Sequence, residues 1–211
     1  GRNNLYGATL MPFNIPILLT WLRIVLIPLM IGIYYVPDAW INGIGRDPAA
    51  MLVFVVAGIT DWLDGWLARR YKLITDFGKL MDPLADKILV TAALLYLLQV
   101  GRIPLWMAVL MVSREFLITG LRLIAASKGV VIPADRAGKH KTISQLVAIL
   151  VALFCLSAQE LGYKGSWLRL MEGATTWLFA WATLITVGSG AWYFWKNRHF
   201  VLDDSVHKPS G

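Results

Sequence analysis

The sequence predicts an all-α integral membrane protein with six transmembrane helices. Apolar residues make up 57% of the 211-residue chain and the mean hydropathy is +0.61, both higher than is usual for a soluble domain of this length. The apolar residues fall into runs separated by short segments that contain Gly, Pro or charged residues. A run of about 20 residues is long enough to cross the hydrocarbon core of a bilayer as a helix.

The first two helices are expected at 15–36 and 49–70. The first run is interrupted by Pro37, which favours a helix end there. The second run has no charged residue before Asp61, and this uncharged part is too short to span a bilayer. We therefore expect the second helix to continue past Asp61, so that charged residues lie in its last turns.

The remaining helices are expected at 80–100, 103–127, 139–161 and 172–196. The sixth is rich in Trp and ends in Trp195 and Lys196, a pattern typical of the membrane interface. We expect one domain over 11–200. Residues 1–10 are interpreted as a non-native leader and residues 201–211 as a polar tail.

The net charge of +7 fits a membrane surface and phosphate-bearing substrates. Nucleic-acid binding is not expected, because the basic residues are scattered between apolar runs rather than gathered in one stripe. The single cysteine, Cys155, lies in an apolar run, which excludes a disulfide framework.

Charge also predicts the orientation in the membrane, because cytoplasmic loops carry an excess of Lys and Arg. Six helices place both termini on one side. The segments on that side hold Arg2, Arg69, Arg70, Lys72, Lys79, Lys128, Arg136, Lys139, Lys141, Lys196, Arg198 and Lys208. The opposite loops hold only Arg46, Arg102, Lys164 and Arg169. Both termini are therefore expected in the cytoplasm.

Four carboxylates lie where the second and third expected helices meet: Asp61, Asp64, Asp82 and Asp86. The first pair is spaced i, i+3 and the second i, i+4, so each pair shares one helix face. One pair alone would be explained as solvated acids at a helix end. If the two helices are antiparallel neighbours, all four converge and repel one another unless cations lie between them. Ligand sets made only of oxygen indicate Mg²⁺ or Mn²⁺.

The same stretch resembles the signature D-x2-D-G-x2-A-R-x8-G-x3-D-x3-D of the CDP-alcohol phosphotransferase family. The matching residues are Asp61, Asp64, Gly65, Ala68, Arg69, Gly78, Asp82 and Asp86. The resemblance implies that Asp61, Asp64 and Asp82 are chiefly ligands of a two-metal site. It implies that Asp86 is both a ligand and the general base. It further implies a homodimer and a CDP-binding set of Asp61, Asp64, Gly65, Ala68, Arg69 and Gly78.

A second set of charged residues is basic and is expected to bind the phosphate of an acceptor. Its members are Arg23, Arg114, Arg122, Lys139 and Lys141. Guanidinium groups match the geometry of a phosphate, and the last four residues are expected at similar depth. The alternatives are that the two Lys contact lipid headgroups and that Arg114 and Arg122 form structural pairs with Glu115 or with the fifth helix.

The segments Ser113-Arg114-Glu115 and Gly138-Lys139-His140-Lys141-Thr142 resemble one branch of the family, as does the start Asn14-Ile-Pro16-x3-Thr20-x2-Arg23. This branch implies transfer of a phosphatidyl group from CDP-diacylglycerol to sn-glycerol 3-phosphate, with release of CMP, in the inner membrane of a bacterium. Serine, inositol phosphate and phosphatidylglycerol are alternative acceptors within the family.

From another class, an ion or phosphate transporter would also use carboxylates inside a membrane. Against it, the acids are expected near one membrane face and the chain has no internal repeat. A structural membrane protein would leave the four Asp residues unexplained.

Overall fold

The structure, a computed structural model, describes residues 15–37, 40, 43–71, 76–130, 132 and 137–198. The expected leader at 1–10 and tail at 201–211 lie outside the described residues. Within the described residues the chain is all-α, with six helices and no strand. The helices are α1 (Ile15–Ile33), α2 (Arg46–Tyr71), α3 (Asp76–Gln99), α4 (Leu105–Ser127), α5 (Ala137–Glu160) and α6 (Ser166–Asn197).

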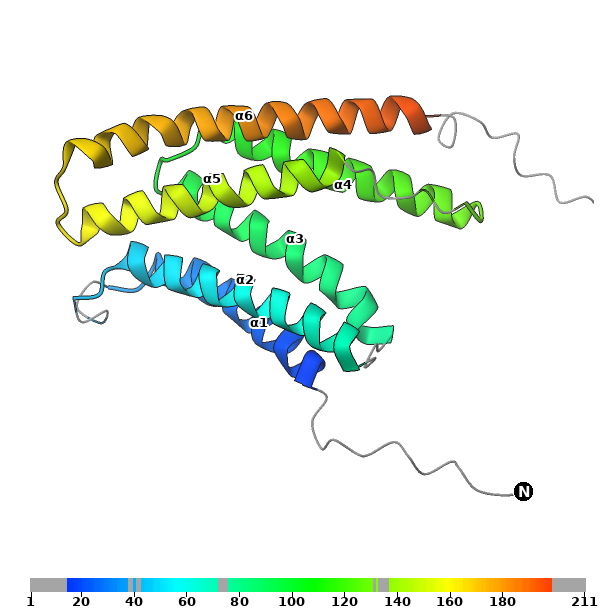
Figure 1. The fold of residues 1–211 in the computed structure, drawn as a ribbon, viewed down its shortest axis with the longest axis horizontal. Helices are drawn as coiled ribbons and strands as arrows, with labels where there is room; N and C mark the ends of the chain where they lie inside the picture. The colour runs from blue at the N-terminus through cyan, green and yellow to red at the C-terminus, as the bar shows by residue number, and fades with distance from the viewer. Residues whose placement is uncertain are drawn as a thin grey trace, which may run out of the picture.

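Successive helices run in opposite directions, so the bundle has two ends (Figure 1). α1 packs against α2 and α3, α5 packs against α2 and α6, and α4 packs mainly against α6. We call the end where α2 finishes and α3 begins the motif end, because it carries the Asp-rich stretch 61–86. The opposite end, where α2 begins at Arg46 and α5 finishes at Glu160, is called the distal end.

Three helical segments within the described residues are long and apolar enough to cross a bilayer: Arg46–Leu67, Lys141–Glu160 and Ser166–Asn197. Large apolar side chains also face outward, and Trp177 and Leu184 are 78% and 68% exposed. Soluble proteins rarely expose so much contiguous apolar surface. These features indicate a membrane protein.

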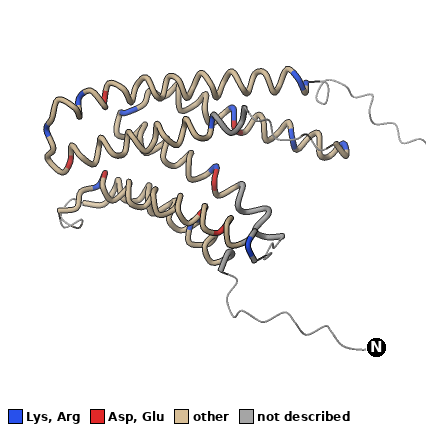
Figure 2. Tube along the Cα trace, viewed as in Figure 1, with Lys and Arg blue, Asp and Glu red and all other residues tan. Residues whose placement is uncertain are grey.

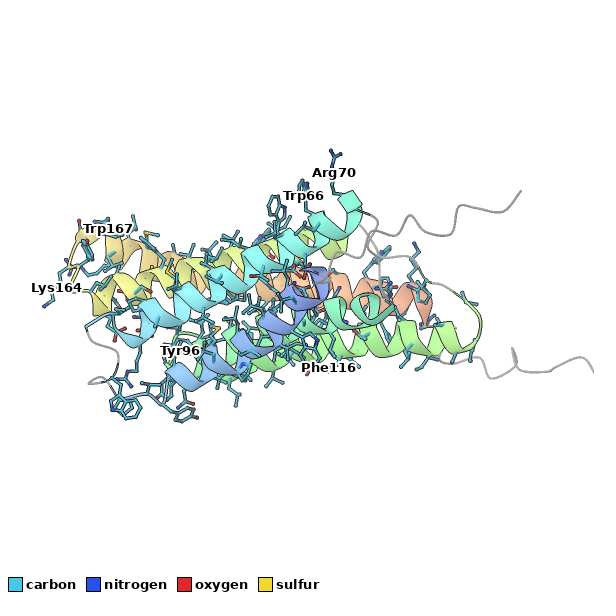
Figure 3. The ribbon with its side chains drawn as sticks, turned by 90° about the horizontal axis from the view of Figure 1, so that it is seen from below. Trp66, Arg70, Tyr96, Phe116, Lys164 and Trp167 are labelled. Carbon is cyan, nitrogen blue, oxygen red and sulfur yellow. The ribbon has the colours of Figure 1, made fainter. Side chains whose placement is uncertain are left out.

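Polar and amphipathic side chains lie where water would meet such a bundle. Figure 2 shows the charged residues at the distal end and in the half nearer the motif end, with long uncharged stretches of α5 and α6 between them. Figure 3 shows Trp66 and Arg70 projecting outward near one end of α2, and Lys164 and Trp167 at the opposite end of the bundle. Trp at an interface and Lys or Arg beyond it are typical of membrane-helix ends.

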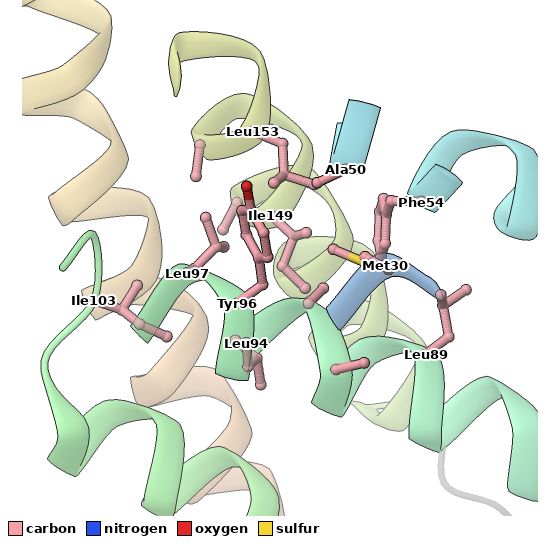
Figure 4. Packing of buried hydrophobic residues seen from close by; sticks show 14 of the residues in the cluster. Met30, Ala50, Phe54, Leu89, Leu94, Tyr96, Leu97, Ile103, Ile149 and Leu153 are labelled. Atoms are coloured by element: carbon pink, nitrogen blue, oxygen red, sulfur yellow. The ribbon is translucent and has the colours of Figure 1, made fainter. Parts of the chain in front are cut away.

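The core takes buried residues from all six helices, and α3 and α5 contribute more of them than any other helix (Figure 4). Its larger buried side chains include Met30, Phe54, Leu97, Ile149 and Leu153. Between them are small residues that let the helix backbones approach closely: Ala50, Ala57, Ala92, Ala93, Ala148 and Ala152. Because lipid tails are as apolar as this core, close packing stabilises the bundle more than burial from water does.

Contacts at the distal end explain why α2 begins at Arg46, earlier than the expected residue 49. Glu160 accepts hydrogen bonds from the backbone N–H groups of Arg46 and Asp47, at 2.9 and 2.7 Å. Tyr96 donates its hydroxyl to Asp47 Oδ1 at 2.6 Å. Pro48 suits a first helical turn because the N–H it lacks would have no partner there. The cap therefore comes from a residue far away in the sequence.

Other helix ends also differ from the prediction, and α3 begins at Asp76 instead of 80. α6 begins at Ser166 instead of 172, and its polar first turns are stabilised where Glu172 pairs with Arg102 at 2.7 Å. α1 ends at Ile33 instead of 36. Beyond it, the N–H groups of Tyr34, Tyr35 and Val36 donate to carbonyl oxygens three residues back, so the last turn is tighter than an α-helix.

Candidate active site

One face of α1 places a charged residue inside the bundle. The buried residues Thr20, Arg23, Ile27 and Met30 recur at three- and four-residue spacing, which puts them on one stripe of the helix. Arg23 is therefore in register with the apolar residues of the core, and its side chain is 0% exposed. A buried guanidinium needs negatively charged partners.

The partners of Arg23 are the first two carboxylates of the signature. Its Nη1 lies 2.6 Å from Asp61 Oδ1, and its Nη2 donates to Asp64 Oδ2. Asp64 is buried with a side chain 5% exposed, whereas that of Asp61 is 39% exposed. The i, i+3 spacing thus brings both carboxylates to one face of α2, as the sequence predicts, and they hold a single positive charge between them.

The third described carboxylate of the signature, Asp86, lies on α3 and lines a cleft between α3, α4 and α5. Glu115 of α4 and Lys141 and Gln145 of α5 line the same cleft. Among the side chains that the structure describes, no group of three or more Asp, Glu, His or Cys comes together to hold a metal ion. The side chain of Asp82 lies outside that set, so the convergence of all four carboxylates stays a prediction.

Two of the expected acceptor residues meet at Glu115. This carboxylate forms an ion pair with Lys141 Nζ of α5 and accepts from Arg114 Nη1 at 3.2 Å. Arg114 also reaches α6, where its Nη2 lies 3.4 Å from Ser189 Oγ. Lys141 is buried and Arg114 is mostly buried. Glu115 therefore serves two cations. With Asp86 and Lys87 on the same cleft, the described side chains supply three cations against two carboxylates, and this excess of positive charge suits an anion.

The other expected site residues are placed differently or lie outside the description. Arg122 lies on α4 and is exposed, and Arg23 contacts Asp61 and Asp64 rather than the Glu115 cluster. The side chains outside the described set are those of Ala68, Arg69, Gly78, Asp82 and Lys139. Their roles, and that of Gly65 in α2, stay predictions.

Comparison with known proteins identifies the family. The family model described as CDP-alcohol phosphatidyltransferase matches residues 13–188. The chain belongs to this family. A Bacillus subtilis relative is 40% identical over 88% of this chain and 95% of its own length. A Haemophilus influenzae relative is 41% identical over 92% and 98%, and an Escherichia coli relative is 36% identical over 92% and 100%. All three are named CDP-diacylglycerol–glycerol-3-phosphate 3-phosphatidyltransferase.

Family membership confirms the resemblance inferred from the signature. In this member of the family, Asp61 and Asp64 lie in the last turns of α2, and Asp82 and Asp86 lie near the start of α3. The matched relatives carry the name of a transferase, so the transporter interpretation is not favoured.

Sequence reasoning missed three features of this family member's site. Lys87, given no role in the site from the sequence, lines the cleft beside Asp86 and donates to Thr119 Oγ1 of α4 at 2.6 Å. Gln145, given no role, also lines the cleft and donates to Thr186 Oγ1 of α6 at 3.0 Å. Arg23 could have been linked to acids, because it shares a stripe of α1 with Ile27 and Met30, which face the core.

Proposed function

We propose that the protein transfers the phosphatidyl group of CDP-diacylglycerol to sn-glycerol 3-phosphate, giving phosphatidylglycerophosphate and CMP. The observation that carries the proposal is the near full-length similarity to relatives that bear the name of this transferase. The cleft adds chemical support, because it combines a carboxylate, Asp86, with the buried cation of Lys141.

In this reaction an acceptor hydroxyl attacks the phosphorus that carries diacylglycerol, and the bond from that phosphorus to CMP breaks. Asp86 takes the proton of the hydroxyl as general base. Arg114, Arg122, Lys139 and Lys141 hold the phosphate of the acceptor. This positions the hydroxyl for attack. The CDP group lies against Gly65, Ala68, Arg69 and Gly78.

The residues also fit a divalent cation. Asp61 and Asp64 already hold one positive group, the Arg23 guanidinium, between their carboxylates. With Asp82 and Asp86 they would form an all-oxygen set that suits Mg²⁺ or Mn²⁺. Such a cation, when bound, neutralises charge on the diphosphate as its bond breaks.

We further propose that all six helices span the inner membrane of a bacterium, with both termini and the motif end in the cytoplasm, and that the protein is a homodimer. The orientation is supported by the unequal distribution of Lys and Arg between the two ends. The lengths of α3 (24 residues) and α4 (23 residues) are sufficient for spanning. The homodimer is supported by the family resemblance alone.

A transfer assay tests the function directly. Purified protein in detergent is mixed with radiolabelled glycerol 3-phosphate, CDP-diacylglycerol and Mg²⁺, and label in the lipid phase is counted. Omission of CDP-diacylglycerol is the control, and serine, inositol phosphate and phosphatidylglycerol are tested in parallel as acceptors. Label in lipid only when both substrates are present supports the proposal. Folded protein that gives no lipid-soluble label, or that prefers another acceptor, contradicts it.

Substitutions test the acceptor site. Arg114→Ala, Arg122→Ala and Lys141→Ala should each raise the KM for glycerol 3-phosphate about tenfold to over a hundredfold, because each removes a charge-assisted contact. The KM for CDP-diacylglycerol should change little. Lys164→Ala, at the distal end, is the matched control and should change neither value. If the three substitutions impair the donor instead, the basic cluster binds the headgroup of the CDP-lipid.

A further inference from the structure

Gly190 of α6 lies against the side chain of Arg114. A Cβ atom at this position would lie 2.6 Å from Arg114 Cγ and 3.1 Å from Arg114 Nε. Because Cγ is close to the start of the side chain, relieving this contact means moving the whole arginine stem and the guanidinium beyond it. Glycine is unfavourable in the middle of a helix, so a buried glycine there indicates a packing requirement.

The neighbouring residue, Ser189, holds the other end of the same side chain. Its Oγ lies 3.4 Å from Arg114 Nη2 and donates to the carbonyl oxygen of Thr186 at 3.1 Å. This second bond directs the hydroxyl proton away from Arg114, which leaves the oxygen as an acceptor for the guanidinium. α6 therefore limits the path of the arginine stem at Gly190 and orients its tip at Ser189.

The other contacts of Arg114 leave one of its hydrogen-bond donors unused among the described residues. Its Nη1 contacts Glu115, which also pairs with Lys141, and its buried Nε has no hydrogen-bond partner among the described residues. An ion pair whose only role was structural would be expected to satisfy this donor and to balance the two cations. A phosphate that entered the cluster would supply both the acceptor and the missing charge.

We propose that Ser189 and Gly190 make α6 a wall of the acceptor site, where they position the Arg114 guanidinium to bind the phosphate of the acceptor. The inference rests on the proposed function, in which Arg114 contacts that phosphate. Ser189 and Gly190 are positioning residues, since they act through Arg114. No sequence motif pointed to them.

The test compares Gly190→Ala with Gly188→Ala, a matched control, because a Cβ at Gly188 meets nothing within 4 Å. Gly190→Ala should raise the KM for glycerol 3-phosphate about tenfold, which is the loss expected when one charge-assisted contact is misplaced. The kcat and the KM for CDP-diacylglycerol should stay within about twofold. The rise in unfolding temperature caused by glycerol 3-phosphate, a measure independent of turnover, should shrink in parallel. Gly188→Ala should change none of these values.

A double variant separates positioning from a general structural effect. In an Arg114→Ala background, Gly190→Ala should cause no further rise in KM, because the side chain it displaces is absent. Ser189→Ala adds no volume and should raise the KM for glycerol 3-phosphate about two- to tenfold. This variant replaces Gly190→Ala as the test if Gly190→Ala does not fold. If Arg114→Ala raises the KM but the α6 variants do not, or if their effects add to it, the inference is wrong while the proposed function stands. If Arg114→Ala itself leaves the KM unchanged, the acceptor role of Arg114 fails first.

Discussion

Replacing Arg23 by Gln should destabilise the protein strongly. The change removes the cation that lies between Asp61 and Asp64 and leaves a shorter, neutral side chain. The Asp64 side chain is only 5% exposed, so its charge would remain buried after losing its contact with the Arg23 guanidinium. Removing one member of a buried pair costs about 3–5 kcal/mol of the free energy of unfolding. The pair with Asp61, which is 39% exposed, adds at most about 1 kcal/mol.

The measurement is equilibrium unfolding in mixed micelles with EDTA present, followed by fluorescence of the ten Trp residues. Arg122→Gln is the matched control, since it makes the same chemical change at an exposed position of α4. This control should alter the free energy of unfolding by no more than about 0.5 kcal/mol. A loss below about 1 kcal/mol for Arg23→Gln would refute the reasoning from the buried ion pair.

The same experiment with Mg²⁺ tests the proposed metal site. A cation that binds only the folded protein stabilises it by about 2.7 kcal/mol at a concentration one hundred times its Kd. The stabilisation should be larger in Arg23→Gln than in the unmodified protein, because the guanidinium no longer competes for the two carboxylates. Equal unfolding with and without Mg²⁺ in both proteins would contradict the metal assignment and leave the ion pair intact.

Three further predictions concern the base, the topology and the distal end. Asp86→Asn should lower kcat at least about a hundredfold while the KM for CDP-diacylglycerol changes little, since general base catalysis contributes about 10²–10⁴; steady-state kinetics would contradict this role if kcat fell less than about tenfold. A cysteine introduced at Ser127 should react with a membrane-impermeant reagent only from the cytoplasmic side, and one at Lys164 only from the opposite side. The native Cys155 is buried and should not react. The reverse pattern would contradict the proposed orientation. Tyr96→Phe should lower the free energy of unfolding by about 1.5–3 kcal/mol, because the hydrogen bond to Asp47 is lost, and should leave turnover unchanged. Tyr163→Phe, at an exposed position, is the control. An unaltered unfolding curve for Tyr96→Phe would mean that the bond contributes nothing to stability.

The six helices could be predicted because each apolar run is long and is bounded by Gly, Pro or charge. The continuation of α2 through Asp61 and Asp64 was predicted by length alone and is confirmed. The helix starts were less accurate where a partner far along the chain stabilises them. No local pattern near Arg46 indicates that Glu160 will cap α2. Caps of this kind depend on the tertiary arrangement.

The site was predictable within each helix and less so between helices. Spacing alone indicated that Asp61 and Asp64 share a face, and the basic motifs indicated that Arg114 and Lys141 act together. Spacing says nothing about which helices are neighbours. That is why Arg23 was expected beside the phosphate-binding residues, whereas its contacts in the structure are with the first acidic pair.

The position of a charge relative to the apolar stripe of its helix carries information that the motifs do not. Arg23 follows the spacing of Ile27 and Met30, so it must face the core, and a cation facing the core requires acids at the same depth on an adjacent helix. The acids expected at that depth are those of the signature, so the spacing of α1 predicts acidic partners for Arg23. The structure shows which of them it contacts, namely Asp61 and Asp64. Applied to Glu115, the same reasoning predicts basic partners on α5. Because Arg114 shares the Glu115 carboxylate with Lys141, the described side chains of the cluster keep an excess positive charge, which is the property expected of a site that binds an anion.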